Sequence, residues 1–218
     1  MKRLLLYLSL FLNGANFFLI MIPMMILAFD GTKSYGGYGI YILVYFTVDS
    51  NLLAAAASLA VSAAALRRLR KPERPYPRCV GLFKLLGTTA VSVTMSTILF
   101  WLGPPDDFVG AFDNVSLYFH LIAPLLAIVT YIFCDRHEPL PFRYTFFSVL
   151  PTALYGTYYA VMVVYVHHWK DFYHFYAGGY WPVSAVIMLV VSYSIGLFLW
   201  GAHRLFFRLP SLRTDRGT

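Results

Sequence analysis

The sequence predicts an all-α membrane protein, a polytopic bundle of six transmembrane helices, and two observations lead to this. The chain of 218 residues is 59% hydrophobic and only 12% charged, far more apolar than an average soluble domain. It also contains six apolar stretches near the roughly 20 helical residues that a bilayer core of about 30 Å requires. They cover residues 4–29, 38–66, 81–102, 112–134, 144–166 and 182–207. Because little chain lies outside them, we expect residues 1–218 to form a single integral membrane domain.

Each of the first three spans has its own sequence feature, and each feature leads to a different prediction. The first follows a basic pair and could be read as a signal peptide, but its apolar region is too long and has no small-x-small cleavage site before Asp30, which favours a retained helix. The second span becomes almost wholly small from Ala54 to Ala65, which predicts close packing against its neighbours. The third follows a basic connection, 67–78, whose prolines stop the preceding helix.

The last three spans are separated by short connections. A tight turn at 103–107 leads into the fourth span, and a connection with Arg136 and Arg143 leads into the fifth. The connection 167–181 before the sixth span is crowded with aromatic side chains, as expected of an interfacial belt. Two sets of three spans would permit an inverted repeat, but the halves share no motif.

The basic residues predict the orientation. Of the 17 Lys and Arg residues, only Lys33 and Lys170 fall in connections on one side, and the rest lie at the ends of the spans on the other side. The positive-inside rule therefore predicts that both termini are cytoplasmic, in a multi-pass protein of the cell (inner or plasma) membrane. This arrangement accounts for the basic charge without a nucleic-acid partner. Cys79 and Cys134 both fall on the reducing side and lack metal-ligand spacing, so we expect two inert cysteines and no metal.

Polar side chains inside the spans are the best candidates for function, because they are costly in hydrocarbon and usually face the protein interior. Helical spacing on the second span gathers one face of small and polar residues: Thr47, Ser50, Asn51, Ala54 and Ser58. The corresponding face of the fourth span holds Ser116, His120, Ala123, Pro124 and Ala127. We expect both faces to point into the bundle.

Thr47 and His120 are predicted to lie at matching depths. They are about nine and about eight residues into spans that both start outside, or roughly 12–14 Å below the boundary at ~1.5 Å per residue. A threonine hydroxyl becomes a useful nucleophile beside a base, and histidine is the commonest base. Two other interpretations stay open: Thr47 bonds its own helix carbonyl and His120 is a satisfied interior group, or both line a transport pathway.

Further polar residues are candidates for substrate binding. Asp49 lies about 200° around the helix from Thr47, so it requires a different partner, such as Asn13, Asn16 or a tyrosine. Asn51, one turn below Thr47, is better placed to orient a substrate carbonyl or the imidazole. On the fifth span, a group of tyrosines lies near the same depth and could line a cavity: Tyr155, Tyr158 and Tyr159. The hydroxyls Thr88, Ser92 and Ser96 of the third span are typical of contacts between helices.

The outer connection contains a second pattern, His167, Asp171 and His174, whose spacing would gather metal ligands if the segment were helical. No further ligand cluster accompanies it, and aromatic residues surround it. We expect this connection to cover a lipid-accessible cavity rather than to bind metal.

Two short motifs, residues 45–51 (YFTVDSN) and 120–125 (HLIAPL), resemble those of bacterial relatives of the androgen-induced and androgen-dependent multi-pass membrane protein family. Eukaryotic members of that family are intramembrane threonine hydrolases that cleave fatty-acid esters of hydroxy fatty acids with a membrane-embedded Thr and His. The resemblance implies that Thr47 is the nucleophile and His120 the base. Asp49 and the loop 171–173 depart from the family pattern, which leaves the substrate open. A related branch transfers acyl chains through cysteine, but neither cysteine here lies at the depth of His120.

Together these observations predict a threonine-dependent hydrolase, or acyl transferase, that acts on fatty-acyl esters from the bilayer without a metal or organic cofactor. Ser50, Asn51 or a tyrosine hydroxyl are candidate donors to the oxyanion. The rival hypothesis is a transporter or proton-coupled carrier that uses Asp49 and His120. A non-enzymatic scaffold is the third.

Overall fold

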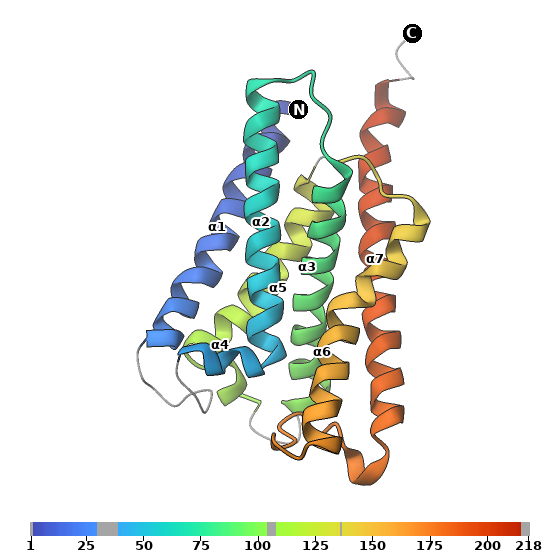
Figure 1. Ribbon diagram of the computed structural model, residues 1–218. Coiled ribbons are helices and arrows are strands. Elements are labelled where there is room, and N and C mark those ends of the chain that lie inside the picture. Colours follow the sequence, from blue (N-terminus) through green and yellow to red (C-terminus); the bar gives the residue numbers. More distant parts are fainter. Residues whose placement is uncertain (1, 30–38, 104–107, 136, 215–218) are drawn as a thin grey trace.

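The computed structural model describes residues 2–29, 39–103, 108–135 and 137–214, and within these ranges it contains helices and no strand. Six helices are long and apolar enough to cross a membrane. They are Arg3–Phe29, Phe46–Arg70, Arg78–Leu102, Val115–Cys134, Phe142–Tyr165 and Trp181–Phe207. This confirms the predicted fold class and number of spans. The first turn of the first span and the last turn of the sixth lie at the same end of the bundle, the terminal end; the opposite end is called the far end (Figure 1).

Helix α2 (Phe46–Arg70) packs between α1 (Lys2–Phe29) and α3 (Arg78–Thr97). The small side chains of α2 allow the close approach that the sequence predicts. A Cβ atom on Gly87 of α3 would lie 3.1 Å from the Cα of Ala54 and 3.1 Å from the Cβ of Ala57. A side chain on Gly87 would therefore crowd the backbone of α2, which lies between α1 and α3.

The second span starts later than predicted, at Phe46 and not at residue 38. The residues before it form a short 3-10 helix, η2 (Gly39–Val44), and Tyr45 has an extended backbone with φ −101° and ψ 128°. Thr47 therefore lies in the first turn of α2, and the depth of about nine residues predicted for it is wrong. Residues 38–46 are apolar on both sides of the break, so hydropathy gave no sign of it.

Three of the spans contain π-helical turns, which widen the helix and often occur at functional sites. The third span ends in η3 (Ile98–Leu102) and the fifth in η8 (Val161–Tyr165). The fourth span consists of α4 (Val115–Leu117), η5 (Tyr118–Ile122), α5 (Ala123–Val129) and η6 (Thr130–Cys134). His120 lies in η5, the first π turn of this span.

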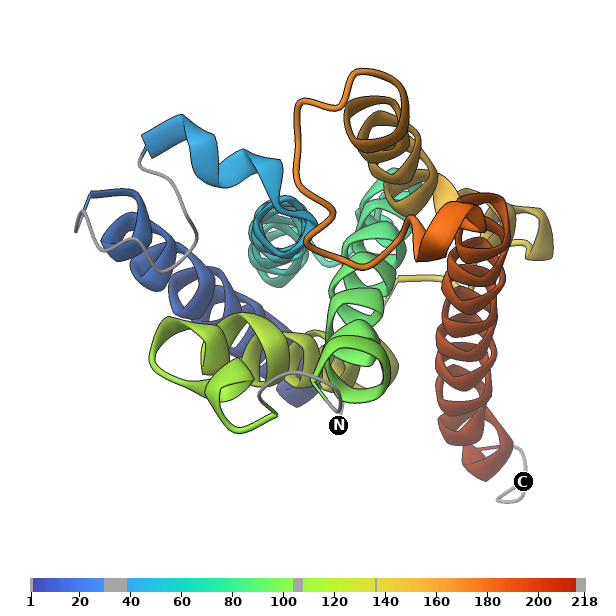
Figure 2. The same ribbon diagram turned by 90° about the horizontal axis from the view of Figure 1, so that it is seen from below.

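The remaining helices complete the bundle. A short 3-10 helix, η4 (Gly110–Phe112), precedes the fourth span. The fifth span consists of η7 (Phe142–Val149), α6 (Leu150–Ala160) and η8, and a loop with the 3-10 turn η9 (Ala177–Gly179) leads to α7 (Trp181–Thr214). Seen along the bundle axis, α7 stands apart from α1 and α2, and α6 lies beside it (Figure 2).

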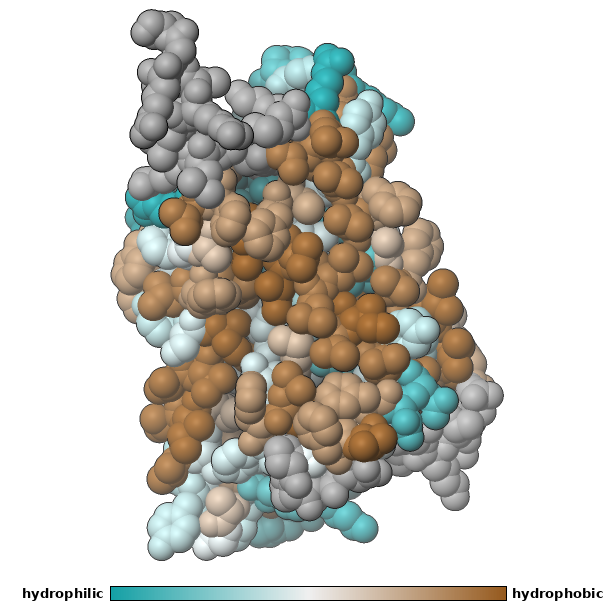
Figure 3. Space-filling model, turned by 180° about the vertical axis from the view of Figure 1, so that it is seen from behind, coloured by the Kyte–Doolittle hydropathy of each residue, from teal (hydrophilic) through white to brown (hydrophobic). Residues whose placement is uncertain are grey.

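Large apolar side chains cover the outside of the bundle, as a lipid-facing surface requires. They include Phe100, Leu154 and Phe198, which are 79%, 69% and 65% exposed. On the face seen from behind, hydrophobic residues form a continuous area over the middle of the molecule, and hydrophilic residues gather toward its two ends (Figure 3).

Candidate functional site

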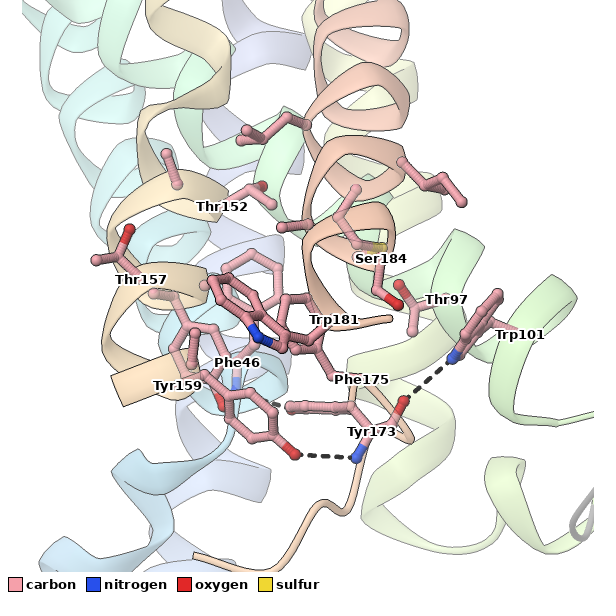
Figure 4. A pocket seen from close by; sticks show the side chains of 18 of the residues that line it. Phe46, Thr97, Trp101, Thr152, Thr157, Tyr159, Tyr173, Phe175, Trp181 and Ser184 are labelled. Carbon is pink, nitrogen blue, oxygen red and sulfur yellow. Dashed lines mark hydrogen bonds between the residues drawn. The ribbon is translucent and has the colours of Figure 1, made fainter. Parts of the chain in front are cut away.

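A cavity of about 370 Å³ lies at the far end of the bundle, between the start of α2, the end of the third span, α6 and α7 (Figure 4). Its walls are largely aromatic and aliphatic, and apart from the indole N–H groups of Trp101 and Trp181 the polar side-chain groups among them are hydroxyls. These belong to Thr47, Thr94, Thr97, Thr152, Thr157, Tyr155, Tyr159, Tyr165, Tyr173 and Ser184. Among the described residues that line the cavity there is no Asp, Glu, Lys, Arg or His. The site therefore fits an uncharged, mostly apolar ligand with a small polar group.

The cavity is only partly enclosed, and α6 and α7 form one side of it. Tyr165 at the end of η8 and Ile187 of α7 both line it, and they are 66% and 45% exposed.

Thr47 is buried on the wall of this cavity, in the first turn of α2. Its neighbour Tyr173 comes from the loop that precedes α7 and accepts a hydrogen bond on its hydroxyl from the backbone N–H of Phe46, at 2.9 Å. Burial raises the pKa of Tyr173 to about 12, while hydrogen bonds with Tyr155, Phe46 and Thr47 lower it. Tyr173 is therefore a neutral hydroxyl beside Thr47 at neutral pH.

His120 has different surroundings. Its ring is buried, and Nδ1 lies 2.7 Å from the backbone carbonyl oxygen of Ala111. A neutral ring must carry its proton on Nδ1 to donate this bond, which leaves Nε2 as an acceptor. His120 is not one of the residues that line the cavity.

The structure makes the Thr47 and His120 segments neighbours without joining the two side chains. The amide of Asn51 donates from Nδ2 to the carbonyl oxygens of both Thr47, at 2.8 Å, and Phe119, at 3.2 Å. Helix α2 and η5 therefore touch at this level, with no helix between them. In the part of the chain that the structure describes, no hydrogen bond links the Thr47 hydroxyl to the His120 ring.

The other predicted residues of the second span serve mainly to connect helices. Ser50 bonds the carbonyl oxygen of Thr47 at 3.1 Å and the hydroxyl of Thr94 at 2.7 Å. Asn51 is committed to the two carbonyls above, and neither Ser50 nor Asn51 lines the cavity. Asp49 is half-buried in the first turn of α2, where a carboxylate is stabilised by the helix dipole.

The predicted tyrosines divide into two groups. Tyr155 and Tyr159 line the cavity, and Tyr155 donates a hydrogen bond to the carbonyl oxygen of Val44 at 2.7 Å. Tyr158 points away from it: this side chain is 53% exposed and its ring packs against Trp169. The fifth span thus presents one tyrosine face to the cavity and another to its surroundings.

Hydrogen bonds to Asp171, and not a helix, fix the conformation of the loop that precedes α7. Its carboxylate accepts hydrogen bonds from the backbone N–H groups of Phe175 and Tyr176, at 2.8 and 2.7 Å, and from the Tyr159 hydroxyl at 3.0 Å. His167 and His174 have positive φ values of 54° and 53°, so the segment is not a helix that could align three ligands. The loop instead contributes Tyr173 and Phe175 to the cavity wall.

Sequence reasoning missed a second polar group, at the terminal end. Lys84 is buried in α3, where its ammonium donates to Asn13 Oδ1 at 2.6 Å and to Ser58 Oγ at 3.1 Å. Asn13 in turn donates to Asp135 Oδ1 at 2.9 Å. Lys84 is therefore not a flanking charge, and Asn13 is a partner of Asp135 rather than of Asp49. A lysine between Phe83 and Leu85, inside an apolar span, was the signal that could have revealed it.

The chain was compared with known proteins. No family model, no curated protein and no solved structure matches it. The resemblance of the motifs 45–51 and 120–125 to threonine hydrolases therefore stays a prediction.

Proposed function

We propose that the protein is an intramembrane enzyme that takes an acyl ester from the bilayer and cleaves it, or transfers its acyl group, at Thr47. The observation that supports this most directly is the position of Thr47 on the wall of an apolar, partly enclosed cavity. Burial among aromatic and aliphatic side chains favours an acyl chain, while the hydroxyls around Thr47 suit the ester group.

His120 is the proposed general base. The hydrogen bond between its Nδ1 and the Ala111 carbonyl holds the ring in the tautomer whose lone pair is on Nε2. A base oriented by a third group is the arrangement that activates a hydroxyl nucleophile. Nε2 must approach the Thr47 hydroxyl when substrate binds, as catalytic hydrogen bonds often tighten only in the complex.

In the proposed reaction, His120 Nε2 takes the proton of the Thr47 hydroxyl as Oγ1 attacks the carbonyl carbon of the ester. The C–O bond to the leaving alcohol breaks, and the alcohol takes the proton from His120. Water, or a second alcohol, then attacks the acyl-threonine with His120 again as base, and Thr47 is restored. Tyr173 is the best candidate donor to the oxyanion, because it lies beside Thr47 on the cavity wall, whereas Ser50 and Asn51 do not line the cavity.

We further propose that the far end faces the outside of the plasma membrane and that both termini are cytoplasmic. A cysteine introduced at Lys170 should then react with an impermeant thiol reagent in intact cells, and one at Arg70 should not. The reverse pattern would place the cavity in the cytoplasmic leaflet.

Enzymatic function is tested with the full-length protein in nanodiscs, by fluorophosphonate labelling and by turnover of a fluorogenic acyl ester. Thr47→Val should abolish both signals. Thr97→Val is the matched control, because Thr97 lines the same cavity but its hydroxyl bonds the carbonyl oxygen of Val93 at 2.9 Å. Equal turnover by the Thr47→Val variant and the parent protein would reject the enzyme.

A proton-coupled carrier is the second candidate function. The buried Lys84–Asn13–Asp135 connection favours it more than the predicted pair of Asp49 and His120 does, because that connection joins ionisable groups inside the bundle. Proton uptake into liposomes that depends on a cotransported solute, and persists in Thr47→Val, would support the carrier.

A further inference from the structure

A polar cluster lies at the terminal end of the bundle, separate from the Thr47 cavity. Its centre is Asp135, which directly follows η6 and is 2% exposed. The polar and titratable groups that face Asp135 or bond it come from α1, the 71–77 connection, α3, η6, the 136–141 connection and α7. They are Ser9, Asn13, Tyr76, Lys84, Tyr131, His137 and His203.

One oxygen of the Asp135 carboxylate is fully engaged. Oδ1 accepts hydrogen bonds from Ser9 Oγ at 2.7 Å and from Asn13 Nδ2 at 2.9 Å. The ammonium of Lys84 donates a hydrogen bond to Oδ1 of the same Asn13 amide at 2.6 Å. Asn13 thus connects Lys84 to the carboxylate. Lys84 and Asp135 therefore interact through an amide and do not form a direct ion pair.

The cluster also contains buried polar atoms that lack a hydrogen-bond partner. Asp135 Oδ2, His137 Nε2 and the Tyr131 hydroxyl are buried and have no hydrogen-bond partner in the described part of the chain. His137 Nδ1 lies 3.0 Å from the carbonyl oxygen of Glu138, so a neutral ring donates there and leaves Nε2 as an acceptor. A proton on Nε2 would turn one of two unpaired acceptors into a donor.

His203 is distinguished from His137 by its contacts. Its ring stacks on His137 with centroids 4.2 Å apart, and its Nε2 lies 3.2 Å from the backbone carbonyl oxygen of Asp135. His203 therefore has a donor role at the main chain, while His137 keeps a ring nitrogen free for a proton.

The charges around Asp135 compete for a single counter-ion. Two cations beside one carboxylate in a low-dielectric interior repel each other, so one proton on either base is the favoured state. Burial lowers the pKa of His137, the Glu138 carbonyl and Asp135 raise it, and Lys84 lowers it further. Burial raises the pKa of Tyr76, with a further rise from Asp135 and opposing effects from Ser9 and Arg68, so this hydroxyl stays neutral. Tyr131 and Cys134 are the remaining titratable neighbours.

We propose that Lys84, Asp135 and His137 form a two-position proton-binding site, in which one proton resides on either Lys84 Nζ or His137 Nε2 and Asp135 is the shared counter-ion. When the proton moves, the Lys84 N–H bond breaks to leave a neutral amine, and a new N–H bond forms on His137 to give imidazolium. The total charge of the cluster is unchanged. The ligand is a proton, and the site does not depend on chemistry at Thr47.

The test follows the protonation of His137 in the full-length protein, labelled with ¹⁵N-histidine, in nanodiscs by NMR. The resonance is assigned by its loss in His137→Gln. Lys84→Gln removes the competing cation and keeps a polar group, so the midpoint of His137 should rise by about one pH unit or more. Lys84→Arg holds a permanent cation, so the midpoint should fall. Lys170→Gln in the outer loop, which removes an exposed lysine, should leave it unchanged.

Opposite shifts in the two Lys84 variants would support the proposal, since a purely structural role of Lys84 gives no reason for opposite signs. Asp135→Asn provides a third measurement, because loss of the counter-ion should lower the midpoint of His137. Shifts of one sign in both Lys84 variants, or an unchanged midpoint in either Lys84 variant or in Asp135→Asn, would overturn the two-position site. Each variant is compared with the parent by its amide spectrum, so that unfolded samples are not scored.

Discussion

The bundle contains two polar regions that differ in nearly every physical property. The cavity at Thr47 is partly open, and its described lining contains hydroxyls and no charged side chain. The cluster at Asp135 is closed, charged and tied to several helices by hydrogen bonds. A buried polar side chain alone therefore does not identify a site for a ligand. Space beside the polar group points to a substrate, whereas ionisable groups without space point to a proton.

The largest effect is expected from separating the charges of the closed cluster. Asp135→Ala leaves Lys84 buried without its counter-ion and should lower the free energy of unfolding by about 3–5 kcal/mol. The measurement is reversible unfolding of the full chain in mixed micelles. Glu138→Gln is the control, because its ion pair with Arg78 spans 3.7 Å at the surface, with both side chains 68% exposed. Such a pair contributes under about 1 kcal/mol. Equal losses in both variants would remove the distinction between the two regions.

The open cavity should respond in the opposite way, through activity rather than stability. Thr47→Val keeps the shape of the side chain and should lower turnover of an acyl ester by about 10³-fold or more, with little change in unfolding. Thr47→Ser should keep part of the activity, because the oxygen remains. His120→Ala should cost a similar factor, and the double variant little more, since dyad members act as a unit. Additive losses in the double variant would argue against a shared step.

Substitutions of Gly196 test how closely α7, which forms one wall of the cavity, packs against η7. A Cβ atom at this position would overlap the side chain of Ser148 in η7. Gly196→Ala should therefore cost about 1–3 kcal/mol of stability through overpacking. Gly201 of the same helix has no atom within 4 Å of an added Cβ, so Gly201→Ala should be neutral or stabilising by about 0.5–1 kcal/mol. Equal thermal midpoints for the two variants would contradict the close contact of α7 with η7.

Acidification should act on the closed cluster first. Burial lowers the pKa of His137 from its ordinary value of 6.5, with opposing effects from the Glu138 carbonyl and Asp135. The unfolded chain therefore binds a proton first, and stability falls as the pH drops below about 6.5, by up to ~1.4 kcal/mol per pH unit. Unfolding titrations from pH 7.5 to about 5 should show this slope in the parent protein and a shallower one in His137→Gln. If the free energy of unfolding of the parent protein does not change with pH over this range, His137 does not titrate as expected.

The smallest effect is expected at Tyr173. Tyr173→Phe removes the hydroxyl that accepts the Phe46 N–H and should lower stability by about 1 kcal/mol. Tyr165→Phe is the matched control, because Tyr165 lies at the rim of the same cavity and is 66% exposed. If Tyr173 also stabilises the oxyanion, its variant alone should reduce turnover. A Tyr165→Phe variant that loses as much stability would show that the loss is general to the cavity.

Much of the fold could be predicted, because hydropathy records each span independently of the others. The bounds of five spans agree with the structure to within a few residues, and the alanine-rich half of α2 packs closely as expected. The break before Phe46 could not be predicted, since Tyr45 changes the backbone direction without changing the hydropathy. The predicted depth of Thr47 failed for that reason.

The sites were less predictable, because they depend on which helices meet. Thr47 was recognised as a polar group on an inward face, but its neighbour Tyr173 comes from a loop more than 120 residues later. Lys84 lies near the start of the third predicted span and Asp135 directly after the fourth, so nothing in the sequence connects them. Only the packing of α1 between them, through Asn13, reveals that they interact.

The proposed uptake of an acyl ester from the bilayer has a consequence for how affinity is measured. A ligand that reaches the cavity from the bilayer has first dissolved there, so site occupancy follows its mole fraction among the lipids and not its concentration in water. Adding lipid at a fixed total amount of ligand should therefore dilute the ligand and weaken apparent binding. Among related esters, the fraction that partitions into the membrane will contribute to selectivity before any side chain of the cavity does.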